Sequence, residues 1–162
     1  MTVFAFSCHP DDIEFMMAGT LLLLRDAGCG IHYMNLADGS CGGTTHDARE
    51  TARIRRGEAI ESAALLGSTF HESITRDIEV FYQDELIRRA TAVIREVAPD
   101  ILLLPSPEDY MEDHMITARI GVTAAFSLRL RKWRSPEIAG STSSWPMGTK
   151  SSGAFFRKSW AS

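Results

Sequence analysis

A histidine and two adjacent carboxylates stand within four residues near the start of the chain, as His9, Asp11 and Asp12. Imidazole and carboxylate groups together suit a zinc-type metal ion, and a further carboxylate beside such an ion suits a general base. The structural alternative is a turn at Pro10 with either Asp capping the helix that follows. This spacing by itself leaves both interpretations open.

A second acidic run that carries a histidine lies much further along the chain, from Pro105 to His114. It follows the uninterrupted apolar run 101–104, which is typical of a strand covered on both faces. The first turn likewise follows an apolar run, at 3–6, that indicates a buried strand. Each acidic run is therefore expected at the carboxyl end of a strand.

Strand and helix patterns alternate along the chain, which predicts an α/β fold: a Rossmann-like three-layer sandwich with a mostly parallel sheet, in a strand order of about 3-2-1-4-5. Strands one and four are neighbours in that order, so we expect their carboxyl-terminal turns to line one crevice and to form a metal site there. The first helix is apolar on nearly every face, which predicts that it is buried. The expected strands are 2–8, 31–36, 69–74 and 101–104, and the expected helices are 13–27, 47–66, 84–97 and 114–128.

The composition argues against several other classes of protein. A net charge of -4 gives no reason to expect nucleic acid or an anionic membrane surface as a partner. No uncharged span approaches the roughly 20 residues that a membrane helix needs. Three cysteines without a CxxC pair do not indicate a disulfide scaffold, and no secretory signal precedes the first strand. We therefore expect a soluble cytoplasmic protein, with homo-oligomerisation left open.

Several motifs together resemble the LmbE-like or PIG-L-like zinc-dependent N-deacetylases. That family has a His-Pro-Asp-Asp-x-Glu turn, as at 9–14, and a Gly-rich loop after its second strand, as at 37–45. An Arg-x-x-Glu-Ala helix follows, as at 55–59. The family's fourth turn is typically Asp-Tyr-His-Pro-Asp-His, against Asp-Tyr-Met-Glu-Asp-His at 109–114 here. The resemblance covers roughly residues 2–128, with the motifs in the same order.

This resemblance implies a role for each matching residue. It implies one Zn²⁺ per chain (other divalent metals are an alternative) and hydrolysis of an N-acyl group, commonly acetyl, on a small glucosamine-like substrate. The implied zinc ligands are His9, Asp12 and His114, with a fourth position left for water, and Asp11 is the implied general base. The implied substrate-binding residues are Arg55 and Asp77, and Asp113 is the implied partner that orients an imidazole from behind. Arg55 as a solvated helix charge is an equal alternative.

One residue departs from the family pattern, because Met111 stands where the family usually carries a histidine. That histidine is thought to stabilise the oxyanion or to protonate the leaving amine, and a thioether can do neither. Losing one oxyanion donor typically costs about 100- to 1,000-fold in turnover. Either another group such as Tyr110 acts there, or the chain is a catalytically impaired or non-catalytic Rossmann-like protein that binds metal or sugar.

The remaining histidines and the first cysteine have structural interpretations. His32 and His71 lie in predicted strands and are expected to be packed or at the surface, while His46, near the crevice mouth, has contact with a substrate as its alternative. Cys8 is expected to face away from the metal site if His9 faces it, because side chains alternate along a strand.

The end of the chain differs in composition from the rest. All three Trp and all three Lys lie beyond residue 130, while residues 1–113 hold 20 of the 21 acidic residues. We therefore expect a deacetylase-like core at 1–130, truncated relative to the family, and an atypical basic tail at 131–162. A flexible tail and a shifted reading frame are the two explanations.

Overall fold

The computed structural model describes residues 1–128, 130 and 133. Its parallel strands form one sheet in the order β3-β2-β1-β4, as predicted, and a fifth strand is absent from these residues. The expected tail at 131–162 lies outside the described residues apart from Trp133. The strands are β1 (Thr2–Ser7), β2 (Gly30–Asn35), β3 (Thr69–His71) and β4 (Ile101–Leu103).

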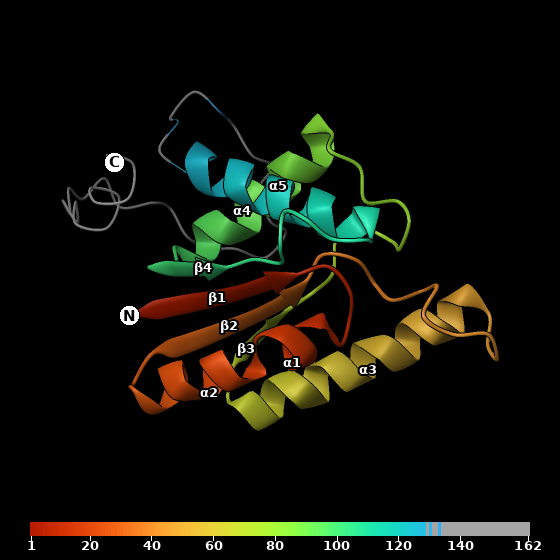
Figure 1. Cartoon of the computed structure of the whole chain (residues 1–162), viewed down its shortest axis with the longest axis horizontal. Helices are drawn as coiled ribbons and strands as arrows, with labels where there is room; N and C mark the ends of the chain where they lie inside the picture. The colour runs from red at the N-terminus through yellow and green to blue at the C-terminus, as the bar shows by residue number, and fades with distance from the viewer. Residues whose placement is uncertain (129, 131–132, 134–162) are drawn as a thin grey trace.

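Helices cover both faces of this sheet, which confirms the three-layer architecture. In Figure 1, α1, α2 and α3 lie on one side of the strands, and α4 and α5 lie on the other. Among the described residues, no helix has both the length and the apolar character needed to cross a membrane. The helices are α1 (Asp12–Met16), α2 (Ala18–Asp26), α3 (Ala48–Leu66), α4 (Asp84–Val97) and α5 (Glu112–Ser127).

The alternation of side chains along β1 divides the apolar interior into two cores. Val3 and Ala5 pack with α1, α2 and α3 on one face of the sheet. Phe4 and Phe6 pack with α4 and α5 on the other. All four side chains are fully buried. β1 is therefore the central strand that both helical layers cover, and the first acidic turn leaves from its carboxyl end.

The single buried helix expected at 13–27 is wrong in two respects. The backbone leaves the helical region at Met17, where φ is -125°, so the segment forms α1 and α2. Leu21 is fully buried whereas Leu23 is 73% exposed, which shows that only one side of α2 faces the sheet. Phe15, at 86% exposed, also lies on the surface. A hydrophobic composition on every face did not translate into burial on every face.

Two strands also differ from expectation. β3 ends at His71 rather than at Ile74. Beyond it, the Ile74 and Thr75 N–H groups donate to the Leu36 carbonyl, and Thr75 forms an isolated bridge with Ala37. β4 was expected to be covered on both faces, but its residues are only half-buried, because it is the outermost strand beside β1 among the described residues. The ends of α3 agree with prediction: Asp47 caps it through the Glu50 N–H, and Gly67 ends it with φ of 71°.

Candidate metal centre

The first acidic turn is organised by the carboxylate of Asp12. Its Oδ2 atom accepts hydrogen bonds from the backbone N–H groups of His9 and Cys8, at 2.8 and 3.1 Å, and from the Ser7 hydroxyl at 3.1 Å. Asp11 occupies the N-cap position of α1, but its side chain makes no capping hydrogen bond. One carboxylate oxygen of Asp12 therefore binds the backbone of its own turn, while the other oxygen, Oδ1, faces His114 of α5.

Three predicted ligand residues converge where the turn after β1 meets the first turn of α5. His9 Nδ1 lies 3.3 Å from His114 Nε2, and His114 Nε2 lies 3.3 Å from Asp12 Oδ1. One ligand atom from each residue lies within 4.8 Å of the others. His114 and Asp12 are buried, so the surrounding protein shields these groups from bulk water. The sheet thus brings together residues 105 positions apart in sequence.

These separations fit a tetrahedral zinc-type ion. Bonds of about 2.0–2.1 Å that meet at a tetrahedral angle place neighbouring ligand atoms about 3.3 Å apart. Both measured ligand separations that involve His114 have this value. Two imidazoles and one carboxylate also form the three-ligand set of a catalytic zinc site, in which a fourth position stays open. Geometry and donor chemistry therefore both suit the ion.

Each histidine is held from behind by a different aspartate. Asp113 Oδ2 lies 3.2 Å from His9 Nε2 and also accepts the Ile78 N–H at 2.8 Å. The side chain of Asp109 lies 3.2 Å from His114 Nδ1. Carboxylates in these positions fix the tautomer and the orientation of a metal-binding imidazole. Asp113 thus contacts the distant histidine rather than the one beside it in sequence.

Asp109 was not singled out from the sequence, although it stands in the same acidic run as His114. The Met111 N–H donates to its carboxylate at 2.9 Å, and this bond, with the contact to His114, lowers the pKa of Asp109. A carboxylate five residues before a candidate ligand was the available signal. Only the turn geometry shows that it reaches the imidazole.

Two residues of β2 support the first turn from the other side. The Asn35 side-chain amide donates to the His9 carbonyl at 2.6 Å, and the Tyr33 hydroxyl lies 3.0 Å from each oxygen of the Glu14 carboxylate. Both side chains belong to almost fully buried residues. A polar pair inside an otherwise apolar strand was the sequence signal, and these contacts explain it.

Asp11 and Arg55 form an ion pair beside the ligand cluster. Arg55 Nη2 donates to Asp11 Oδ2 at 2.5 Å and also to the Pro10 carbonyl. The Arg55 side chain is 22% exposed, which argues against the solvated helix charge. Asp11 has φ of 106°, a conformation that costs a non-glycine residue of order 1–3 kcal/mol. The arginine therefore anchors a strained residue next to the candidate metal centre.

Asp77 holds the Gly-rich loop that follows β2. Its two carboxylate oxygens accept the backbone N–H groups of Gly39 and Cys41, at 2.8 and 2.9 Å. Gly39 has φ of 75°, and a Cβ at this position would lie 2.9 Å from Arg55 Cβ and 3.1 Å from Pro10 Cγ. The loop therefore packs tightly on the first turn. The structure gives Asp77 a loop-stabilising contact, and its predicted contact with substrate stays a prediction.

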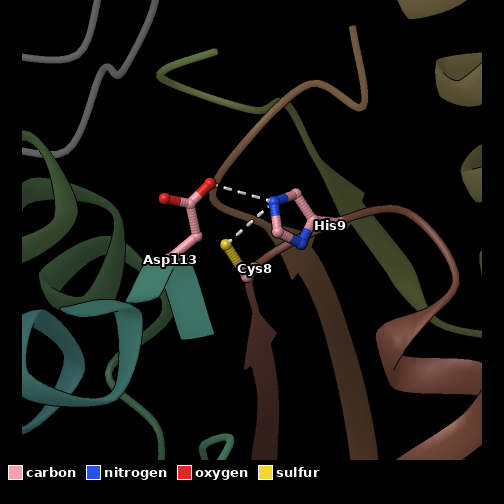
Figure 2. A group of neighbouring side chains, drawn as sticks. All are labelled: Cys8, His9 and Asp113. Carbon is pink, nitrogen blue, oxygen red and sulfur yellow. Dashed lines mark hydrogen bonds and ion pairs between the residues drawn. The ribbon is translucent and has the colours of Figure 1, made fainter. Parts of the chain in front are cut away.

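Cys8 was expected to face away from the metal site, and its thiol lies at His9 Nε2, whereas the contact of His9 with His114 is made by Nδ1. Cys8 Sγ lies 3.5 Å from His9 Nε2, as Figure 2 shows together with the contact of Asp113. β1 ends at Ser7, so the alternation of side chains along a strand does not set the orientation of residues 8 and 9. Burial raises the pKa of the Cys8 thiol, and the nearby hydroxyl of Thr117 acts in the opposite direction.

The other histidines lie apart from this cluster of ligands. His32 Nδ1 is 2.8 Å from His71 Nε2, and their rings stack with centroids 5.1 Å apart against Phe4. Burial lowers the pKa of both imidazoles, to about 4 for His71. They are packed residues, as expected. His46 is exposed in the loop before α3, and its contact with substrate stays a prediction.

Met111 is half-buried at the N-cap of α5, on the turn that carries Asp109 and His114. Its thioether offers no hydrogen-bond donor to the crevice. Tyr110, the residue named as its replacement, is 93% exposed. The turn therefore carries the candidate ligand His114 and its partner Asp109, and the Met111 side chain adds no proton donor.

Known proteins share both the sequence pattern and the fold. A diacetylchitobiose deacetylase from Thermococcus kodakarensis is 34% identical over 139 residues, which are 82% of this chain and 52% of that protein. The structure of the N,N'-diacetylchitobiose deacetylase from Pyrococcus horikoshii, complexed with an inhibitor, is 35% identical. It has a TM-score of 0.68 and matches 78% of this chain and 48% of its own.

The same fold also occurs in a protein whose name describes other chemistry. The 4-carboxy-2-hydroxymuconate hydratase from Pseudomonas putida has a TM-score of 0.76 at 21% identity, covering 85% of this chain and 60% of that one. At this identity the likeness concerns the fold alone. The chain spans about half the length of the curated relative that it matches.

Residues 4–125 match the PIG-L family, described as GlcNAc-PI de-N-acetylase. This range includes the first acidic turn, Arg55 and the whole of the second turn. The chain therefore belongs to the PIG-L family.

Proposed function

We propose that this chain is a metal-dependent N-deacetylase that removes an acetyl group from an N-acetylglucosamine-like substrate. The observation that carries the proposal is the convergence of His9, Asp12 and His114 at separations suited to a tetrahedral ion. Asp11 precedes Asp12 in the same turn. Membership of the PIG-L family and the likeness to two diacetylchitobiose deacetylases support the choice of substrate class.

His9, Asp12 and His114 would hold the ion, with Zn²⁺ as the proposed metal. A bound ion of this kind supplies Lewis acidity for an amide carbonyl and a water of lowered pKa. In the net reaction the amide C–N bond breaks, the water oxygen joins the acyl carbon, and acetate and a free amine leave. Asp11, which is not among the ligands, would accept a proton from that water at its carboxylate, and a proton would pass to the leaving nitrogen to give the free amine.

The ion pair with Arg55 gives Asp11 a fixed orientation for that proton transfer. Arg55 binds Asp11 and the Pro10 carbonyl through the same guanidinium nitrogen, which restrains both the side chain and the backbone of the turn. Asp113 and Asp109 in turn restrain His9 and His114. We propose that Arg55 and Asp77 also limit where the sugar enters, Asp77 through the loop that it stabilises.

The experiment combines metal analysis with acetate release from N,N'-diacetylchitobiose and N-acetylglucosamine. We expect about one zinc ion per chain and measurable acetate release. Asp11→Asn removes the proton acceptor and should lower turnover at least about 100-fold while the metal content stays unchanged. The matched control is Asp47→Asn at the N-cap of α3, where Asn is an equally good cap, and it should retain normal turnover.

The absence of a donor at Met111 favours one alternative, a non-catalytic protein that binds metal or sugar. Zinc bound at one ion per chain, with no acetate released from any N-acetylated amino sugar, would support this alternative. A metal content that is unchanged in His9→Ala would contradict both functions, because each depends on that ligand.

A further inference from the structure

A second group of metal-binding side chains lies on the other side of the His9 ring. We propose that Cys8, His9 and Asp113 form a separate site for a thiophilic divalent cation. Their donor atoms lie within 4.8 Å of one another. Figure 2 shows the thiol and the carboxylate both directed at the same ring nitrogen, Nε2.

The measured separations fit metal coordination as well as hydrogen bonding. A tetrahedral zinc-type ion, with a thiolate at about 2.3 Å and an imidazole nitrogen at about 2.0–2.1 Å, holds these two atoms about 3.6 Å apart. A carboxylate oxygen in place of the sulfur gives about 3.3 Å. Cys8 Sγ and Asp113 Oδ2 lie 3.5 and 3.2 Å from His9 Nε2. Both separations from His9 Nε2 therefore match those expected around a bound ion.

The two metal sites use opposite nitrogens of one imidazole. His9 Nδ1 lies 3.3 Å from His114, in the site proposed above, whereas Nε2 lies beside Cys8 and Asp113. Occupation of the second site releases the thiol proton and the Nε2 proton to solvent, and the ring then bridges two ions. The second ion displaces the hydrogen bond between Asp113 and His9, not a ligand of the first ion.

The surroundings of the sulfur favour a soft cation. Thr117 is fully buried on α5 near Cys8, and its hydroxyl oxygen has no hydrogen-bond partner of good geometry among the described residues. A free hydroxyl at this position can donate to a thiolate once a metal is bound. Thiolate ligands select Zn²⁺ and softer divalent ions such as Cd²⁺ over Mg²⁺ and Ca²⁺. The site is therefore expected to take Cd²⁺ or surplus Zn²⁺ and to ignore Mg²⁺.

The test uses the full chain in which both other cysteines are replaced, Cys29→Ser with Cys41→Ser, so that Cys8 is the only thiol left. This variant is titrated with Cd²⁺, and thiolate-to-metal charge-transfer absorption is recorded together with the number of bound ions. We expect two ions per chain and a charge-transfer band that saturates with one of them. Mg²⁺ should neither produce the band nor compete for it.

Two further variants separate this site from the proposed catalytic one. In the same background, Cys8→Ser should abolish the band and leave one ion, whereas His114→Ala should keep the band. Absence of the band in the Cys29→Ser, Cys41→Ser protein overturns the second site whatever Cys8→Ser does to folding. Failure of the deacetylase proposal appears instead as missing acetate release and leaves the band unchanged.

Discussion

Replacement of Gly39 by alanine tests how tightly the Gly-rich loop packs on the first turn. Gly39 has φ of 75°, and alanine in this left-handed conformation costs about 1 kcal/mol. The new Cβ would also lie 2.9 Å from Arg55 Cβ and 3.1 Å from Pro10 Cγ. Neither atom is the far end of a flexible chain, so we add about 1–3 kcal/mol for overpacking. Gly39→Ala should therefore lower the free energy of unfolding by about 2–4 kcal/mol.

Thermal and urea denaturation measure this loss. In a chain of this size 1 kcal/mol corresponds to about 2–4 °C, so the melting temperature should fall by roughly 4–16 °C. The control is Gly57→Ala in α3, where a Cβ meets nothing within 4 Å and the helix should gain about 0.5–1 kcal/mol. An unchanged or raised melting temperature for Gly39→Ala, beside a stabilised Gly57→Ala, would refute the close packing of loop, Arg55 and Pro10.

Three further changes test the histidine pair and the contacts around the metal centre. The pKa of His71 falls from 6.5 to about 4 on burial, so the unfolded chain binds the proton more readily and stability declines as the pH falls from about 6.5 to 4. His71→Phe should remove about 1–2 kcal/mol of this decline, after allowance for partial exposure, as measured by urea denaturation at pH 7 and pH 4.5. Asp113→Asn should weaken zinc binding about 10- to 100-fold in a chelator competition, because the His9 ring loses its orienting carboxylate. An unchanged zinc affinity would show that this contact does not orient His9. Arg55→Lys keeps the charge but loses the planar guanidinium that contacts Asp11, so turnover in the acetate assay should fall at least about 10-fold while the melting temperature changes little.

The fold could be predicted well because its signals are local. Short apolar runs before each turn, Asp47 at a helix start and Gly67 at its end all agree with the structure. Strand–helix alternation indicates a parallel sheet, since parallel strands need crossover helices. The 3-2-1-4 order agrees with the order expected of a doubly wound sheet. The first helix was misjudged because composition does not say which side of a helix meets the sheet: Leu21 is buried and Leu23 is not.

For the candidate site, the sequence by itself determined which groups are available: a histidine beside two carboxylates in one turn, and a histidine among acidic residues in another. The tertiary structure decided how they pair. It directs Asp113 to the distant His9, gives Asp109 to His114, and turns Cys8 toward the imidazole. The contact of Asp113 with His9 crosses from α5 to the turn after β1, so its distance depends on sheet order and helix packing. The other two contacts depend on the local backbone geometry of each turn. Proximity in the sequence does not show which aspartate contacts which histidine.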